Sequence, residues 1–333
     1  MNDWLSFNEL IDEENQYWTR QLQLSSSLTM SPSLSPSLSP SSSPTGQPTN
    51  TPTTSFPTTP PSSFPSFRCN ITPSAREAAL FAIAVSVSKD DLVTDGSTPQ
   101  GQALEWLVNI DPLFLCPSEV DAIIQRYATA VFYLSIGAAT TSTDLPGTPE
   151  CEWAGIICDA GTVSQLQFEE ELGGTIPEEI VQFTDLIVLK IEDSLITGSI
   201  PSNIGSLQNL LAIDLNINGM TGSIPDSLYL LKNLQQLDLD NNFFTGTLSE
   251  DIDDLVSLRF LQLESNSFTG TIPETLGNIA VLEQATFDEN KFTGEMPDAV
   301  CANRGDGNIG GPLVVLNTDC PPQFFCDCCT ILC

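Results

Sequence analysis

The sequence predicts an α/β repeat protein, in which six short repeats stack into a parallel sheet between a helical cap and a cysteine-rich cap. Three observations predict this solenoid. Glycines recur every 24 residues from Gly174 to Gly294. A Leu-x-x-Leu-x-Leu-x-x-Asn pattern precedes most of them, and cysteine clusters flank the periodic stretch. A fixed period of this length indicates a repeat architecture.

The leucines of each repeat predict a short strand. Leu234, Leu237, Leu239 and Asn242 show the pattern most clearly. Because Leu-x-Leu has a period of two, its leucines point to one face of a strand. One such strand cannot bury this face alone, so stacked copies form a parallel sheet over a continuous core. The first repeat, around Leu166, departs from the pattern and lacks the asparagine.

Two further columns of residues recur with the same period, and we expect both in the core. The first consists of asparagines at the bend after each strand, where backbone groups turn inward and need partners. An amide both donates and accepts, and an unpaired buried polar group costs about 1–3 kcal/mol. The second column is apolar. The two columns are Asn218, Asn242, Asn266 and Asn290, then Ile196, Met220, Phe244, Phe268 and Phe292.

The repeat pattern, followed by Gly-x-Ile-Pro, resembles the plant-type leucine-rich repeat. The segment CEWAGIIC, Cys151 to Cys158, is similar to the Cys-x-Trp-x-Gly-x-x-Cys signature that opens ectodomains of that subclass. This resemblance implies a Cys151–Cys158 disulfide, with Trp153 covering the open end of the leucine core. Residues 98–111 and 125–137 resemble the cap of leucine-rich repeat proteins from diatom-type algae, many of which are membrane-attached or secreted.

Composition divides the chain into five zones. The first is acidic and has apolar residues that would share one side of a helix, with a disordered tail as the alternative. The second is rich in Ser, Thr and Pro, which predicts a disordered stalk or linker. The zones are an acidic N-terminal segment 1–24, the stalk 25–67, a helical cap 68–161, the repeats 162–300 and a cysteine-rich cap 301–333.

The cap zone predicts three helices. Thr72 followed by Pro73 is a helix start signal, and apolar residues from Leu80 to Val87 follow a helical period. A shorter helix is expected over 102–108. A third is expected over 118–136, with Val120 among its inward residues and Gly137 as its stop.

The cysteines are even in number, which is typical of disulfides in an oxidising compartment. The six C-terminal cysteines predict three disulfides, in which the adjacent Cys328 and Cys329 pair with other cysteines and not with each other. A metal site made of thiolates is the alternative, and we predict no metal. Cys69 and Cys116 remain to pair across the helical cap. Asn70 begins an N-glycosylation sequence. The C-terminal cysteines are Cys301, Cys320, Cys326, Cys328, Cys329 and Cys333.

The formal charge of −33, without histidine, excludes ordinary nucleic-acid binding. No apolar segment reaches the roughly 18 residues that span a bilayer. Residues 1–24 lack the basic and apolar regions of a signal peptide. We therefore expect a mis-assigned start, a fragment, or an intracellular protein, and we favour the first two. An extracellular or cell-surface location follows, with the cytoplasm as the alternative.

The outward strand positions would line a concave face, and acidic residues recur there every 24 residues. Charges about 5 Å apart repel by roughly 3 kcal/mol at an effective dielectric of 20. This predicts a site for a cationic partner, such as a basic peptide, a basic protein patch, a polyamine or Ca²⁺; the alternative is a solvated, salt-screened face. The candidate residues are Glu169, Lys190, Glu192, Asp214, Asn216, Asp238, Asp240, Gln262, Glu264 and Asp288.

Catalysis has little support in the sequence, because histidine, Gly-x-Ser-x-Gly, a P-loop and a cysteine in a nucleophile's context are all lacking. We therefore expect no enzyme and no cofactor. The predicted function is receptor-like recognition of a protein, peptide or glycan through the acidic concave face. The alternatives are a structural or adhesive cell-wall protein and an inhibitor of a secreted hydrolase. Lys190 is expected to pair with Glu169 or Asp214 across strands.

Overall fold

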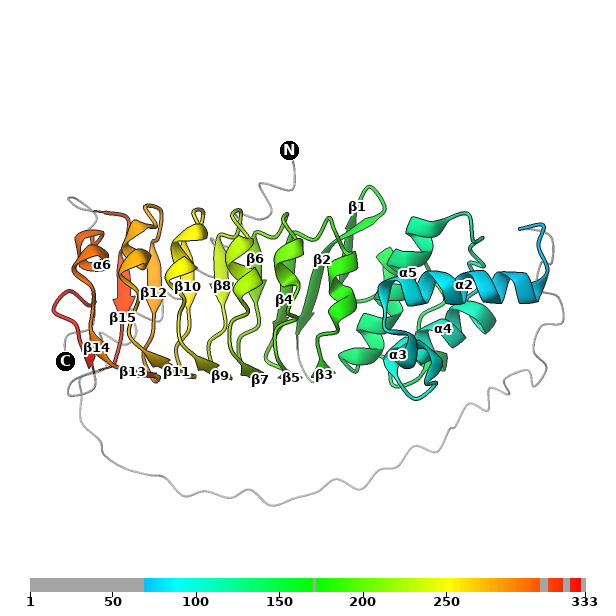
Figure 1. Ribbon diagram of the computed structural model, residues 1–333, viewed down its shortest axis with the longest axis horizontal. Helices are drawn as coiled ribbons and strands as arrows, with labels where there is room; N and C mark the ends of the chain where they lie inside the picture. Colours follow the sequence, from blue (N-terminus) through cyan, green and yellow to red (C-terminus); the bar gives the residue numbers. More distant parts are fainter. Residues whose placement is uncertain (1–68, 170–171, 306–310, 320–323, 331–333) are drawn as a thin grey trace, which may run out of the picture. The chain divides into compact units, whose positions relative to one another are not determined.

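The computed structural model describes residues 69–169, 172–305, 311–319 and 324–330. The acidic segment 1–24, the stretch 25–67, Cys320 and Cys333 lie outside these residues, so the predictions made for them stay predictions. Figure 1 shows helices of the cap followed by a regular stack of strands. The predicted solenoid and its two caps are thus confirmed in the described part of the chain.

The cap contains α2 (Pro73–Val87), α3 (Asp90–Thr94), α4 (Pro99–Asn109) and α5 (Val120–Ser135). Thr72 and Thr98 cap α2 and α4, because each side chain accepts a backbone N–H of the first turn and each is followed by proline. Because Thr98 and Pro99 start α4 earlier than expected, this helix is longer than the predicted helix over 102–108. The short helix α3 was not predicted. Among the described residues, no helix is long and apolar enough to cross a membrane.

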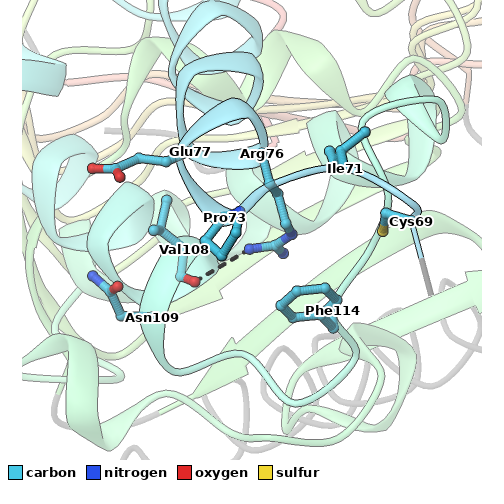
Figure 2. Close-up of a pocket in the computed structure, with 8 residues that line it drawn as sticks. All are labelled: Cys69, Ile71, Pro73, Arg76, Glu77, Val108, Asn109 and Phe114. Carbon is cyan, nitrogen blue, oxygen red and sulfur yellow. Dashed lines mark hydrogen bonds between the residues drawn. The ribbon is translucent and has the colours of Figure 1, made fainter. Parts of the chain in front are cut away.

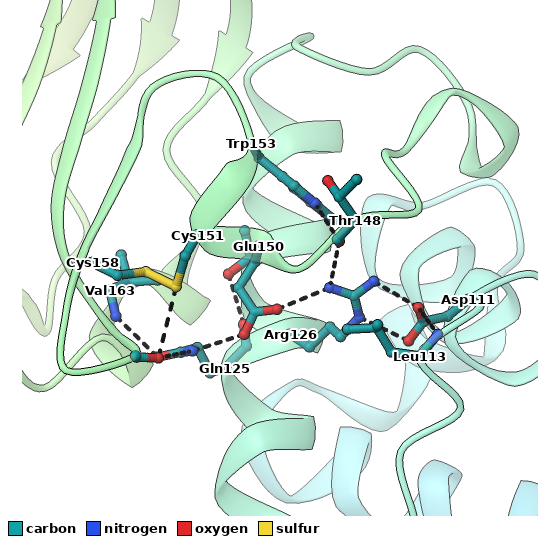
Figure 3. A network of polar contacts seen from close by, with 12 residues as sticks. Asp111, Leu113, Gln125, Arg126, Thr148, Glu150, Cys151, Trp153, Cys158 and Val163 are labelled. Atoms are coloured by element: carbon teal, nitrogen blue, oxygen red, sulfur yellow. Dashed lines mark hydrogen bonds and ion pairs between the residues drawn. A yellow bond between two sulfur atoms is a disulfide. The ribbon is translucent and has the colours of Figure 1, made fainter.

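Arg126 on α5 is completely buried and ties the cap together (Figure 3). Its Nε and Nη2 donate to the two carboxylate oxygens of Asp111 at 2.8 and 2.6 Å. Its Nη1 donates to Glu150 Oε2 at 2.9 Å and to the Thr148 carbonyl at 3.1 Å. A buried charge is tolerated only when it is paired and hydrogen-bonded. These contacts join α5 to the segment after α4 and to the residues just before Cys151. Val120, expected inward, is 43% exposed at the start of α5.

Eight strands form the main sheet, in the order β1-β2-β4-β6-β8-β10-β12-β15. All neighbours are parallel except β1, which pairs antiparallel with β2 and shifts register between Ile157 and Cys158. Six strands come from the six predicted repeats. The strands are β1 (Ile156–Asp159), β2 (Thr162–Glu169), β4 (Val188–Glu192), β6 (Ala212–Asp214), β8 (Gln236–Asp238), β10 (Phe260–Gln262), β12 (Gln284–Thr286) and β15 (Val315–Asn317).

The C-terminal cap contributes the last strand of this sheet, which was not predicted. β15 pairs in parallel with β12, with Leu316 opposite Ala285. Leu313 and Leu316 are fully buried, so they take the positions of repeat leucines. Asp319 then accepts the backbone N–H groups of Glu289 and Asn290 at 2.7 and 3.1 Å. The cap therefore completes the last bend as well as covering the core. The cap also contains β16 (Phe324–Phe325), which pairs in parallel with β14 (Gly294–Glu295) at the end of the last repeat, and α6 (Asp298–Ala302) joins that repeat to the cap.

A second, six-stranded parallel sheet runs along the stack and was also not predicted. It carries the apolar column, and Phe244, Phe268 and Phe292 stack with ring centroids 6.2 and 6.1 Å apart. Short 3₁₀ helices complete the first five repeats. The strands are β3 (Gly173–Thr175), β5 (Leu195–Gly198), β7 (Gly219–Gly222), β9 (Phe243–Gly246), β11 (Ser267–Gly270) and β13 (Lys291–Phe292); the 3₁₀ helices are η3 (Glu178–Gln182), η4 (Ile204–Ser206), η5 (Asp226–Leu230), η6 (Glu250–Asp254) and η7 (Glu274–Asn278).

The asparagine column forms a hydrogen-bonded ladder between the two sheets. Asn242 Nδ2 donates to the carbonyls of Leu215, Leu239 and Asp240 at 2.8 to 3.2 Å. Its Oδ1 accepts the Met220 N–H at 2.9 Å. The same contacts recur at Asn218, Asn266 and Asn290. Each amide thus satisfies backbone groups of its own repeat and of the preceding one.

The 24-residue glycine period has a steric origin. Gly246 has φ +89°, and a Cβ built there would lie 3.0 Å from Ser223 Cβ in the preceding repeat. Gly270 is similar: its φ is +83°, and a Cβ built there would lie 2.9 Å from the methyl carbon of Thr247. Left-handed backbone and close approach of neighbouring repeats both require glycine at this position.

Four disulfides lie in the described residues: Cys69–Cys116, Cys151–Cys158, Cys301–Cys328 and Cys326–Cys329. The implied Cys151–Cys158 bond and the suggested bond across the cap are confirmed, and the adjacent Cys328 and Cys329 take separate partners. Trp153 packs on Tyr133 and Trp106 at centroid distances of 4.8 and 5.7 Å. The tryptophan therefore joins the repeat stack to the helical cap.

Replacing Asn242 by alanine should lower the free energy of unfolding by about 2–4 kcal/mol, because several buried backbone groups lose their partner at once. Denaturant unfolding followed by circular dichroism measures this. The matched control is Asn233→Ala, which removes a single exposed hydrogen bond to the Gln208 carbonyl and should cost less than about 1 kcal/mol. Equal losses in both variants would contradict a special role for the ladder.

Gly246→Ala should destabilise more than Gly161→Ala. Both glycines have similar positive φ, +89° and +92°, but nothing lies within 4 Å of a Cβ at Gly161. Each variant loses about 1–2 kcal/mol from left-handed backbone, and only Gly246→Ala adds the clash with Ser223. Thermal unfolding of both proteins measures the difference; identical melting temperatures would show that the repeat contact is unimportant.

Candidate functional site

The candidate site is the concave face, defined as the outward side chains of β2, β4, β6, β8, β10 and β12 and of the residues that follow these strands. In-register pairing sets Lys190 opposite Gln167 and Asp214, and Asp214 opposite Asp238. Gln262 lies between Asp238 and Thr286. The sequence-selected residues therefore lie in neighbouring rungs, about 4.8 Å apart.

The inner part of this face is much less accessible than expected. Asp214, Asp238 and Asp240 are each only 3% exposed, and Gln262 is 5% exposed. Glu192, Asn216, Glu264 and Asp288 are partly exposed and Glu169 is exposed. The expectation that the whole set is open to a partner needs correction. In the column that follows the strands, Glu192, Asn216, Glu264 and Asp288 are accessible, whereas Asp240 of that column and the two aspartates within the strands, Asp214 and Asp238, are sheltered.

Hydrogen bonds and ion pairs hold these side chains in place. Asp214 Oδ1 accepts the Asn216 N–H at 3.3 Å, and Asp238 Oδ1 accepts the Asp240 N–H at 3.2 Å. Lys190 Nζ lies 3.1 Å from Glu192 Oε2 on its own strand and 3.9 Å from Asp214 Oδ2 on the next. The lysine therefore balances two acidic residues at one end of the face; its pairing with Glu192 was not predicted.

Burial makes these carboxyl groups hard to ionise. It raises the pKa of Asp238 well above its ordinary value, and the charges of Asp214 and Asp240 add to this. Burial raises the pKa of Glu264 to about 7, although a hydrogen bond from the Thr286 hydroxyl opposes the shift. The pKa of Asp288 is raised in the same direction, first by burial. Glu264 is therefore partly protonated near neutral pH.

A further column beside the site was not selected from the sequence. Its five residues have left-handed backbone, with φ between +46° and +55°. Ile217 is 48% exposed, an unusual position for a β-branched residue because left-handed backbone crowds it. The signal available in the sequence was the 24-residue spacing itself. The column consists of Asp193, Ile217, Asn241, Ser265 and Glu289.

A small cavity of about 230 Å³ lies in the cap, away from the concave face (Figure 2). Arg76 is 3% exposed beside it and donates to the carbonyls of Leu107, Val108 and Leu115 at 3.2 to 3.3 Å. Its guanidinium also lies 4.0 Å from the Phe114 ring centroid. Because these contacts occupy the guanidinium, Arg76 has a structural role in joining α2 to the end of α4 and to the segment after it.

A model of the leucine-rich repeat family matches residues 233–255 and 257–279. The chain contains leucine-rich repeats. The matched residues are the fourth and fifth of the six leucine-rich repeats, where the leucines and the asparagine ladder follow the pattern most closely. No curated protein matches the chain significantly. Across the described residues, no three His, Cys, Asp or Glu side chains converge where they could hold a metal ion.

Several solved structures with leucine-rich repeats are partly similar to this chain. The PEPR1–AtPEP1 complex is 34% identical over 47% of this chain and 22% of its own, with a TM-score of 0.44. The plant peptide hormone receptor RGFR1 in complex with RGF2 is 31% identical over 44% and 23%, with a TM-score of 0.41. The BIR3–SERK2 complex from Arabidopsis thaliana is 30% identical over 44% and 80%, with a TM-score of 0.40. The chain thus spans under a quarter of the first two.

The raised pKa of Glu264 predicts a pH dependence of stability. Its ordinary value is 4.5 and its value here is about 7, so between these pH values the folded state holds a proton that the unfolded state has lost. Stability must then fall as pH rises through this window. Glu264→Gln should raise the free energy of unfolding at pH 8 by about 2–3 kcal/mol and have little effect at pH 4.

Denaturant unfolding at a series of pH values measures this effect, with the exposed Glu274→Gln as the control. Asp240 and Asp288 raise the pKa of Glu264, and Thr286 lowers it, so Thr286→Val should widen the window. A Glu264→Gln variant with the same pH profile as the parent protein would contradict the assignment.

Proposed function

We propose that this leucine-rich repeat chain is a non-enzymatic module that binds an extended cationic peptide, free or as part of a protein, across the strands of its concave face. The observation that supports the proposal is the register of acidic residues after the strands. Glu192, Asp240 and Asp288 recur at every second repeat, and Glu264 lies between the last two. Lys190 is the single cation among the ten residues selected for this face.

The spacing of these carboxylates favours a particular peptide. Every second parallel strand is about 9.6 Å away, and three residues of extended peptide span about 9.9 Å. A peptide that crosses the strands with a basic residue at every third position would therefore meet Glu192, Asp240 and Asp288 in turn. Asp240 lies deepest, and a long lysine side chain reaches further than a short one. Exposed Ile217 would contact an apolar residue between two basic ones.

Two further parts of the proposal concern the setting. We infer that the module works in an oxidising compartment, outside the cell or at its surface, because the described cysteines form disulfides. RGFR1 is a receptor in complex with RGF2. Because its likeness covers less than half of this chain, the proposal rests instead on the regular spacing of the acidic residues that follow the strands. Recognition needs no chemical step, so we expect the module to leave its peptide unchanged.

The test is binding of nine-residue peptides with three lysines, measured by fluorescence anisotropy. A peptide with lysine at every third position should bind about tenfold more tightly than one of the same composition with adjacent lysines, because only the first matches the register. Affinity should fall with added salt. Equal affinity for both peptides would contradict the match in spacing and would show that the face attracts cations only as a general acidic surface.

A charge-matched pair of variants locates the site. Glu192→Gln with Asp240→Asn and Asp288→Asn should weaken binding of the spaced peptide by about tenfold or more. Glu250→Gln with Glu274→Gln and Asp298→Asn removes the same charge from exposed positions elsewhere and should change it by less than about threefold. A similar loss in both triple variants would contradict binding on the concave face.

A further inference from the structure

A second cleft lies where the helical cap meets the repeats, away from the concave face. It has a volume of about 540 Å³, within the range of about 300–1,000 Å³ of small-ligand sites. The end of α2, the start of α3 and the start of α4 form one side. The other side is formed by η3 and by Ser202 and Asn203, which precede η4. Val87, Leu92 and Val181 give it an aliphatic wall, and Glu178 and Glu179 give it carboxylates.

Glu179 is the buried charge of this cleft, with 3% of its surface exposed. The Ser88 hydroxyl donates to its Oε1 at 2.6 Å, and Gln100 Nε2 donates to both carboxylate oxygens at 3.2 Å. The Tyr127 hydroxyl in turn donates to Ser88 Oγ at 3.1 Å. Burial raises the pKa of Tyr127, so it remains a donor. Ser88 and Gln100 thus both donate to the carboxylate, whose oxygens accept from them.

This carboxylate has hydrogen bonds but no counter-ion in the described part of the chain. The ion pairs found there involve Arg126, Lys190 and Arg259 and leave Glu179 out. Buried charges in proteins are usually paired, because desolvation of a lone ion is costly. Lys89 also lines the cleft, but its own backbone begins α3 and its side chain is exposed. A cation from outside would supply the missing charge.

We propose that this cleft binds a primary ammonium group on an aliphatic chain, with the ammonium on Glu179 and the methylenes against Val87, Leu92 and Val181. The aliphatic wall selects for a methylene chain, and the carboxylates select for positive charge. A free diamine and a lysine side chain share this chemistry. The site is separate from the concave face, so it stands whether or not that face binds peptides.

Isothermal titration calorimetry of the full chain at low salt tests the proposal. Cadaverine represents the free diamine, N-acetyl-lysine methylamide represents the side chain, and the diol counterpart of cadaverine is the uncharged control. The diamine should bind at least about tenfold more tightly than the diol. If the lysine derivative binds as well as cadaverine, the site accepts a partner's side chain; if it binds far more weakly, the ligand is a free amine. Equal binding of diol and diamine would overturn the proposal.

Variants separate this site from the general attraction of an acidic chain for amines. Glu179→Gln keeps the shape and should weaken cadaverine binding by about tenfold or more, whereas Glu274→Gln removes an equal, exposed charge and should not. Lys89→Met should strengthen binding, because a like charge leaves the cleft. Val181→Trp fills the aliphatic wall and should block binding with Glu179 intact. If Glu179→Gln and Val181→Trp both fold, by circular dichroism, and bind cadaverine like the parent, the cleft is not an amine site.

Discussion

The asparagine ladder is the interaction on which the stacked structure depends. Every turn of a solenoid brings backbone groups into its interior, and these groups need partners that water cannot provide. Asn242 and its counterparts supply them as both donor and acceptor, because each amide donates to one carbonyl and accepts from one N–H of the preceding repeat. Because each amide serves two repeats, a repeat cannot keep its own bend without its neighbour. Core burial and strand pairing then follow from the same stacking.

That dependence creates the problem of ending the stack, and the two ends solve it differently. At the C-terminal end, Asp319 supplies the acceptors that a further repeat would have offered, and β15 continues the sheet. At the N-terminal end, helices replace repeats, and Arg126 with Asp111 and Glu150 joins them to the turn before β1. An ionisable side chain thus takes the place of repeat backbone at the C-terminal end, whereas at the N-terminal end a buried ion-pair network joins the helices to that turn. The cleft beside Glu179 lies at the second of these junctions, where helices meet repeats and the packing changes type.

Much of the fold could be predicted from the sequence because periodic columns report directly on core positions. The leucines, Asn242 and Phe268 were assigned correctly from spacing alone. The second sheet was missed because its strands are short and glycine-rich, so their alternation carries little signal. β15 was missed because cysteine dominates the composition around it. Asp238 was expected to be open to a partner, but it is buried. The repeat period shows on which face a residue lies, but it does not show how deeply neighbouring side chains enclose that residue. The burial of Arg76 and Arg126 was not predicted either.

The reversed strand β1 has a consequence for how copies of this chain meet one another. A parallel strand with a free edge is a template on which a second solenoid could continue the sheet. β1 runs opposite to the seven strands that follow it in the sheet, is four residues long and carries a register shift. The Cys151–Cys158 disulfide also fixes the chain close to this edge. These features make the β1 edge a poor partner for strand pairing with a second copy. The helical end of the stack is therefore protected against end-to-end polymerisation, although each repeat inside the stack pairs with both of its neighbours.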